Sequence, residues 1–224
     1  TGIDLLERLL RHSFRFEFTE LTLDILRVLK LQYSVVDGDV EKYRDAKEKY
    51  LLYERIWLME SRAESHYSEL MIQFTNSKST KTEVTDLAKT YYAELEGFMG
   101  ECSSFKLHLF GRMIRLTIFN SATDYRQTAT LCEEAIAFFD RKEYDSGLPL
   151  QVFYYNLVVC YLQLREFEKG QELISRCEYF FTEGTFNWYK LQELFFLLAM
   201  HSGHYTEAYH LYERVTGLPR FSDQ

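Results

Sequence analysis

Residues 154–177 read YYNLVVCYLQLREFEKGQELISRC, and this stretch is the clearest guide to the architecture of the chain. From Tyr154 to Leu164 nearly every residue is apolar, which predicts a helix buried on more than one side. A turn at Arg165–Glu166 leads into a second helix. Its stripe of apolar or small residues recurs every three or four positions: Phe167, Gly170, Ile174 and Cys177. Such a helical hairpin cannot cover both faces of its first helix alone, so we expect similar hairpins on either side.

An aromatic residue followed three positions later by a small residue recurs along the chain. The pair occurs at Phe167–Gly170, Tyr205–Ala208, Tyr125–Thr128 and Tyr43–Ala46, with a weaker version near Val84, where Leu87–Ala88 take the small-residue place. The five sites follow one another at intervals of 38 to 42 residues. Near-constant spacing between about 20 and 50 residues is typical of stacked repeats.

We therefore predict an all-α protein in which residues 1–224 form a single array of about five stacked antiparallel helical hairpins. The expected hairpins span roughly 20–59, 61–100, 103–141, 149–182 and 186–216. Ile3, Leu6 and Leu10 predict a further helix before the first hairpin. The sequence does not begin with Met, so we expect a fragment of a longer protein whose last hairpin exposes apolar surface.

Short local signals predict where helices begin and end. Ser61–Arg–Ala–Glu64 and Thr80–Lys–Thr–Glu83 both match the capping box, so we expect one helix to begin at each. Asp37–Gly38 is expected to end a helix, because glycine adopts the left-handed conformation found there. The polar segment NSKSTK at residues 76–81 is interpreted as a longer hairpin turn, with a domain boundary as the alternative.

Composition and charge exclude several classes of protein. The net charge is −8 and no block of Lys or Arg stands out, which argues against nucleic acid as a partner. No apolar run is long enough for a membrane span, and the N-terminal residues do not resemble a signal peptide. The 4 cysteines form no CxxC pair and lie in apolar surroundings. We interpret them as reduced core residues of a cytoplasmic protein, with disulfides as the alternative.

The stretch quoted above resembles the tetratricopeptide repeat. Leu157, Val158, Tyr161, Phe167 and Gly170 fall at that family's spacing for a leucine, a small residue, a tyrosine, a second aromatic and an alanine. The last hairpin is similar more loosely, through Phe195, Phe196, Ala199, Gly203, Tyr205 and Ala208. The chain departs from the family in three ways: the opening Trp is absent, Val158 replaces the usual small residue, and the period is about 38–42 residues instead of about 34.

The resemblance implies a right-handed superhelix whose concave face binds an extended peptide or a partner helix. Carried over to this chain, the groove-facing positions are Val152, Tyr155, Val159 and Gln163 on one helix and Lys190, Glu193, Leu197 and His201 on the next. Some members of the family grip a peptide's terminal carboxylate with Lys, Asn and Arg. Here only Asn156 and Lys190 match that set, whereas Met113, Thr117 and Leu194 do not, so we reject this clamp.

Two residue clusters have a functional and a structural interpretation. His201, His204 and His210 could hold a metal ion, but their spacing fits no ligand motif, and we interpret them as surface or groove histidines. A tyrosine face formed by Tyr43, Tyr50 and Tyr53 could stack on a ligand, although helical aromatic stripes more often belong to a core.

No phosphate-binding loop, GxSxG or HExxH motif is present, so we expect neither catalysis nor a cofactor. We predict a non-catalytic scaffold for protein–protein interaction, with self-association through uncapped ends as a further possibility. The alternative is a ligand- or peptide-sensing helical-repeat domain of a larger regulatory protein.

Overall fold

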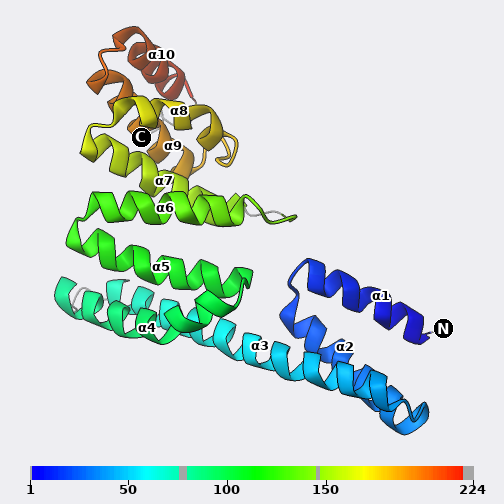
Figure 1. Ribbon diagram of the computed structural model, residues 1–224. Coiled ribbons are helices and arrows are strands. Elements are labelled where there is room, and N and C mark those ends of the chain that lie inside the picture. The colour runs from blue at the N-terminus through cyan, green and yellow to red at the C-terminus, as the bar shows by residue number, and fades with distance from the viewer. Residues whose placement is uncertain (1, 76–79, 145–146, 219–224) are drawn as a thin grey trace. The chain divides into compact units, whose positions relative to one another are not determined.

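The computed structural model describes residues 2–75, 80–144 and 147–218, and these form ten α-helices and one π-helical segment, with no strand among them (Figure 1). The predicted all-α class is therefore confirmed. The chain divides into two compact units, Thr1–Ile118 and Phe119–Gln224. A single array over residues 1–224 stays a prediction.

The first unit contains α1 (Gly2–Arg15), α2 (Thr19–Leu31), the π-helical segment η1 (Gln32–Val36), α3 (Val40–Thr75), α4 (Lys81–Glu101) and most of α5 (Phe105–Ala122). The second contains the end of α5 and then α6 (Tyr125–Phe139), α7 (Gly147–Leu164), α8 (Phe167–Glu178), α9 (Phe186–His201) and α10 (Tyr205–Thr216). Within this second unit α6 packs on α7, α7 on α8, and α9 on both α7 and α8, while α10 packs on α9 (Figure 1). Neighbouring helices therefore cover one another there, as the sequence predicts.

Four turns between consecutive helices share one backbone geometry. In each, one residue has a positive φ of 54° to 79°: Glu17, Thr123, Arg165 and Gly203. The N–H of the next residue donates to the carbonyl oxygen five residues earlier, over 2.8 to 3.1 Å. The donor–acceptor pairs are Phe18–Ser13, Asp124–Phe119, Glu166–Tyr161 and His204–Ala199. This is the long-range bond of the Schellman motif, and here it ends one helix and sets the start of the next.

A small buried residue follows each of these turns, five positions after the residue with positive φ: Thr22, Thr128, Gly170 and Ala208. The last three belong to aromatic–small pairs found in the sequence, so each of these three pairs follows an interhelical turn at the same distance. The pairs at Tyr43–Ala46 and Leu87–Ala88 follow no turn of this kind, although Ala46 and Ala88 are buried. The prediction that these two pairs in the N-terminal half mark the same kind of turn is therefore wrong.

The helix α3 runs unbroken from Val40 to Thr75, so the break predicted at Ser61–Glu64 is wrong. No Gly or Pro occurs between Val40 and Thr75, and Ala63, in the second half of the helix, is completely buried. The sequence at Ser61 matches the capping-box pattern but forms no cap. A capping residue needs a non-helical backbone, whereas Ser61 lies within α3. One helix therefore passes through both of the hairpins predicted at 20–59 and 61–100. By contrast, the box at Thr80–Glu83 is formed and opens α4.

Two hydrophobic clusters of the first unit lie along different halves of α3. Near its N-terminal half, Ala46 joins the buried residues of α2 and η1, and Tyr43 and Tyr50 pack against them together with Ile3, Leu6 and Leu10 of α1. Tyr53 lies 5.1 Å from Phe14, measured between ring centres. The core interpretation of the tyrosine face is thus confirmed, as is the helix predicted from Ile3, Leu6 and Leu10.

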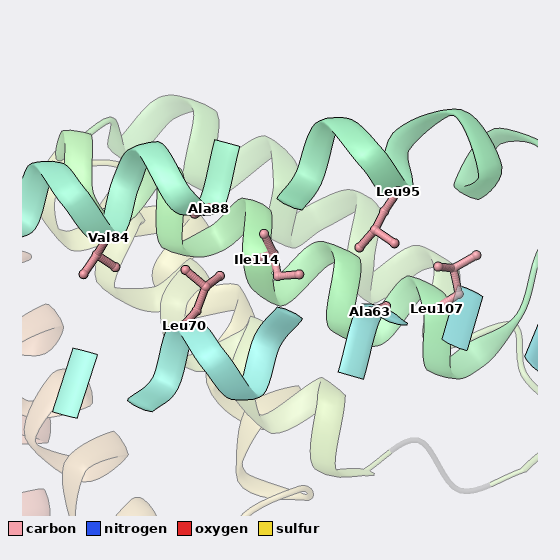
Figure 2. Close-up of a cluster of buried hydrophobic side chains, with 7 residues drawn as sticks. All are labelled: Ala63, Leu70, Val84, Ala88, Leu95, Leu107 and Ile114. Atoms are coloured by element: carbon pink, nitrogen blue, oxygen red, sulfur yellow. The ribbon is translucent and has the colours of Figure 1, made fainter. Parts of the chain in front are cut away.

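The second cluster joins the C-terminal half of α3 to α4 and α5. Its buried members are Ala63 and Leu70 of α3, Val84, Ala88 and Leu95 of α4, and Leu107 and Ile114 of α5. Figure 2 shows Leu70, Val84 and Ala88 toward one end of the cluster, Ala63, Leu95 and Leu107 toward the other, and Ile114 between them. Because each half of α3 has its own partners, the length of this helix is set by tertiary packing.

The cysteines support the interpretation as core residues. No disulfide joins the four, all of which lie in the described part of the chain, and Cys132, Cys160 and Cys177 are buried. Burial raises the pKa of Cys160 and of Cys177 to about 12 and raises the pKa of Cys132 well above its usual value. These thiols are therefore protonated and unreactive near neutral pH.

A buried carboxyl group, Glu60, connects the middle of α3 with the starts of α2 and α5. Its side chain accepts hydrogen bonds from the hydroxyls of Thr19, over 2.9 Å, and Ser104, over 2.5 Å. The residue is only 4% exposed, and this burial raises its pKa although both hydroxyls act in the opposite direction. Lys106 also lowers the pKa of Glu60, and the like charge of Glu17 raises it further. The folded state therefore binds the proton of Glu60 more tightly than the unfolded state does.

We predict that Glu60→Gln changes how stability depends on pH. A raised pKa in the folded state means that wild-type stability falls as the pH rises from the unfolded value of about 4.3 through the folded value. Glu60→Gln has no such titration. Its free energy of unfolding, measured by urea denaturation, should therefore increase relative to that of the wild type as the pH rises. Glu83 is the control, because its pKa is lowered by the hydrogen bonds from Thr80. Glu83→Gln should show the opposite trend, and equal trends would contradict the assignment.

Gly170 of α8 is predicted to tolerate no branched side chain. A Cβ atom there would lie 2.7 Å from Cδ2 and 3.1 Å from Cδ1 of Leu198, which is buried in α9. Gly170→Val should lower the free energy of unfolding by about 1–3 kcal/mol, as measured by urea denaturation. The matched change Gly97→Val is made in open space on α4 and should stay within about 0.5 kcal/mol of the wild type. A neutral Gly170→Val would show that α8 and α9 are less closely packed.

Candidate functional site

The eight predicted groove residues lie on two neighbouring helices of the second unit. Val152, Tyr155, Val159 and Gln163 recur at helical spacing on α7, and Lys190, Glu193, Leu197 and His201 do so on α9. None of the eight is fully buried, and the apolar ones are half-buried. Since α7 packs directly against α9, two partly exposed rows lie on adjacent helices.

Contacts of individual side chains show the chemistry of these rows. Lys190 Nζ lies 3.0 Å from Glu193 Oε2, and this hydrogen bond is the main cause of the raised pKa of Lys190. Tyr155 adds a smaller contribution in the same direction, which places it within electrostatic range of the ammonium group. His201 stacks on Phe167 with ring centres 5.8 Å apart. The rows thus combine apolar side chains with charged groups that are already paired.

A cleft of about 600 Å³ opens between α9 and α10. Aromatic and aliphatic side chains form most of its wall, and the lining residues are Gly184, Phe186, Tyr189, Lys190, Gln192, Glu193, Phe196, Leu211, Tyr212, Val215 and Thr216. Only Lys190 and Glu193 also belong to the predicted groove. The structure therefore brings two of the eight predicted residues into this cleft and leaves the other six outside it.

The preceding hairpin explains why this cleft is open. The turns of α7–α8 and α9–α10 are separated by 38 residues, so Phe196 occupies the position of Val158, and Val215 that of Cys177. Val158 and Cys177 are both 0% exposed, and α9 packs against the helices that carry them. Phe196 and Val215 are only half-buried. The cleft therefore corresponds to the place that a neighbouring helix fills one hairpin earlier.

Arg214 fixes the α10 wall of the cleft to the rest of the unit. Its guanidinium group donates to Glu178 at 3.0 Å and to Glu183 at 3.1 Å, and it lies 5.2 Å from the ring centre of Trp188. The hydrogen bond to Glu183, followed by that to Glu178, raises the pKa of Arg214. The wall is thus held by charge-assisted bonds at the surface, besides the packing of α10 on α9.

Gln192 is a polar residue in the otherwise apolar part of the cleft. It is 1% exposed, and its Nε2 donates to Glu178 Oε1 over 3.3 Å. Its Oε1 is buried and accepts no hydrogen bond from the described residues. A buried acceptor without a donor carries a desolvation penalty of about 1–3 kcal/mol.

The sequence prediction missed most residues of this cleft. Phe196 was noted only as a position of the repeat, and Tyr189, Leu211, Tyr212 and Val215 were not singled out. A usable signal was nevertheless present, because α10 carries three tyrosines at positions 205, 209 and 212, whereas an amphipathic helix needs only one apolar face. Tyr205, Tyr209 and Tyr212 are 66%, 57% and 58% exposed.

The histidine cluster does not converge on one point. His201 stacks on Phe167, His204 lies 3.7 Å from Glu207, and His210 lies 3.9 Å from Glu213. Among the described residues no group of three or more His, Cys, Asp or Glu side chains is placed to hold a metal ion. Nor is any helix of the described ranges both long and apolar enough to cross a membrane.

Comparisons with protein families, with curated proteins and with solved structures found no match for this chain. The resemblance to the tetratricopeptide repeat therefore stays a prediction, and the function is argued from the geometry alone.

We predict that zinc does not bind at the three histidines. Each imidazole has a different neighbour, namely Phe167 of α8 for His201 and Glu207 and Glu213 of α10 for His204 and His210, so no site with three or four ligands is formed by these residues. Titration of the chain with zinc chloride should give no heat beyond dilution in isothermal calorimetry. Heat that disappears in a His204→Ala variant would contradict this prediction.

Proposed function

We propose that this chain is a non-catalytic scaffold for protein–protein interaction, a divergent tetratricopeptide-like array wound as a right-handed superhelix. In this proposal the partly exposed rows of α7 and α9 form its concave face and bind a peptide or a partner helix. The observation that carries the proposal is the pairing of these two rows on adjacent helices of one unit. The repeated turn geometry supports the repeat interpretation, because it recurs at Thr123, Arg165 and Gly203.

The chemistry of the two rows suits a partner with apolar anchors. Val152, Tyr155, Val159 and Leu197 offer half-buried apolar surface. Tyrosine is among the residue types that most often carry the binding energy of an interface, and the aliphatic side chains around it would exclude water. Lys190 and Glu193 neutralise each other at the edge, so they would add specificity more than affinity. The four free thiols, three of them buried, support placing the scaffold in the cytoplasm.

The alternative function is a ligand- or peptide-sensing domain of a larger regulatory protein. The α9–α10 cleft favours it, because about 600 Å³ lies within the usual range of small-molecule sites. Catalysis has less support, since among the described residues that line this cleft only Lys190 and Glu193 carry a charge, and these two pair with each other.

Peptides selected from a random library for binding to the chain provide the test of the scaffold. We predict that Tyr155→Ala and Leu197→Ala each weaken the selected peptides by about tenfold or more, because they remove apolar anchors. Both residues are partly exposed, so circular dichroism and thermal unfolding should stay close to the wild type. The matched control is Met200→Ala, an exposed residue of α9 outside both the rows and the cleft. Unchanged affinity in both groove variants would remove the proposed binding face.

A further inference from the structure

We propose that a pocket between α2 and α3 binds an arginine side chain from a basic segment of a partner protein. This α2–α3 pocket has a volume of about 500 Å³. It is lined by Glu20, Leu23, Asp24 and Arg27 of α2 and by Tyr50, Glu54 and Trp57 of α3. Both helices belong to the first unit, whereas the groove rows belong to the second, so this site goes beyond the proposed function.

The exposed indole ring of Trp57 is the first feature that points to a cation. The chain has 2 tryptophans, Trp57 and Trp188. Trp188 is 2% exposed, and the guanidinium group of Arg214 lies 5.2 Å from its ring centre. Trp57 is 40% exposed, and none of the described residues places a ring or a cation against it. Tryptophan attracts cations more strongly than the other aromatic residues do, so the accessible ring of Trp57 suits a cationic partner.

The carboxylates of the α2–α3 pocket are only partly balanced by cations. Asp24 is paired with Arg27, and Oδ1 of the first lies 2.8 Å from Nη2 of the second. Glu20 and Glu54 are exposed, and neither forms an ion pair within the described part of the chain. The charged groups of the lining are therefore three carboxylates and one guanidinium group.

A lysine outside the lining covers one of the two aromatic rings. Lys30 Nζ lies 3.6 Å from the ring centre of Tyr50. Even with Lys30 counted, the carboxylates of the pocket outnumber the cations. The ring of Trp57 and the carboxylates of Glu20 and Glu54 are then left for a cation from outside the chain.

The second unit contains a site in which the same three kinds of group hold an arginine. Arg214 donates to Glu178 over 3.0 Å and to Glu183 over 3.1 Å, while its guanidinium group lies near the ring of Trp188. One tryptophan ring and two carboxylates thus bind one guanidinium group. A planar guanidinium group can bond two carboxylates and stack on a ring at the same time, which the compact ammonium group of lysine does less well.

The α2–α3 pocket offers this set of groups without the arginine. Glu54 and Trp57 are three residues apart, so they lie on neighbouring positions of one face of α3. The hydrogen bond from Thr19 to Glu60, over 2.9 Å, holds the start of α2 against the same part of α3. Glu20 follows Thr19 directly and therefore lines the pocket together with Trp57.

The overall charge of the chain also favours a basic partner. A net charge of −8 attracts cationic segments over long distances and raises their rate of association. This attraction acts on any cation and is not confined to one site. A specific site is therefore recognised by its dependence on Trp57, which carries no charge.

Fluorescence polarisation with a labelled peptide at low ionic strength provides the test. The probe is a short peptide in which arginine alternates with serine, and lysine or glutamine replaces arginine in two comparison peptides. We predict that the arginine peptide binds more tightly than the lysine peptide and that the glutamine peptide does not bind. Trp57→Leu should raise the dissociation constant of the arginine peptide about threefold or more, because it removes the ring without changing the charge. Glu54→Gln should raise it by a similar factor.

Two matched changes on α3 serve as controls. Ile72→Ala removes an exposed apolar side chain and Glu64→Gln an exposed carboxylate, both outside the pocket. Each should leave the dissociation constant unchanged. Trp57 and Glu54 are exposed, so thermal unfolding of their variants should match that of the wild type.

The intrinsic fluorescence of the chain gives a second measurement with unlabelled peptide. Because Trp188 is buried, a change in emission on binding should come from Trp57. The arginine peptide should change the emission of the wild type and leave that of Trp57→Phe unchanged. Phenylalanine keeps an aromatic face, so Trp57→Phe should still bind the labelled peptide more tightly than Trp57→Leu does.

Four results would overturn the proposal. Absence of binding would show that the pocket does not accept arginine. An affinity that Trp57→Leu leaves unchanged would mean that the peptide responds only to the net charge. Equal affinity for the lysine peptide would contradict the assignment to arginine. Loss of affinity in Tyr155→Ala or Leu197→Ala would place the peptide in the groove rows, so failure of this proposal is distinguished from failure of the scaffold.

Discussion

The hydrogen bond that closes each interhelical turn is the constraint on which the packing of consecutive helices depends. It joins the N–H of the residue before the new helix to the carbonyl five positions back, and it requires the intervening residue to be left-handed. Three of those residues, Glu17, Thr123 and Arg165, have a side chain, and this conformation costs each roughly 1–2 kcal/mol. The packing must offset that cost, and the small buried residues allow it to do so. Thr22 meets Ser13 of α1, and Gly170 meets Leu198 of α9.

The sequence predicts this turn only where an aromatic residue marks it. At the last three turns the aromatic–small pair begins two residues after the left-handed residue, so the pattern and the geometry coincide. At the first turn Thr19 takes the aromatic position, and nothing in the pattern reveals it. Conversely, Tyr43 and Ala46 share a face of α3 because both pack on α2, and a helix produces that spacing with or without a turn. The unbroken course of α3 is equally hidden, since its two halves are covered by different helices.

The two candidate surfaces of the second unit, the groove rows and the α9–α10 cleft, were predictable from the sequence to different degrees. Helical periodicity is enough to place the eight groove residues on common faces of α7 and α9, and all eight are at least partly exposed. Periodicity does not predict the cleft, because it does not show whether another helix covers a given hairpin. Val158 and Phe196 are both apolar, yet Val158 is completely buried on α7, against which α9 packs, whereas Phe196 lines the cleft. Comparison of equivalent positions in consecutive hairpins shows the difference once the turns have fixed the register.

The pair Lys190–Glu193 belongs both to the groove rows and to the lining of the cleft, and this links the two proposed surfaces. An occupant of the cleft would remove water from one side of this pair, and the cost of desolvating both charges would then oppose the gain in their attraction. If the occupant held Lys190 on Glu193, the same side chains would be less able to reorient toward a peptide in the groove. Coupling between binding sites is reciprocal, so a peptide that drew Lys190 away from Glu193 would weaken binding in the cleft by the same factor. An occupied groove and an occupied cleft would therefore influence each other through a single ion pair on α9.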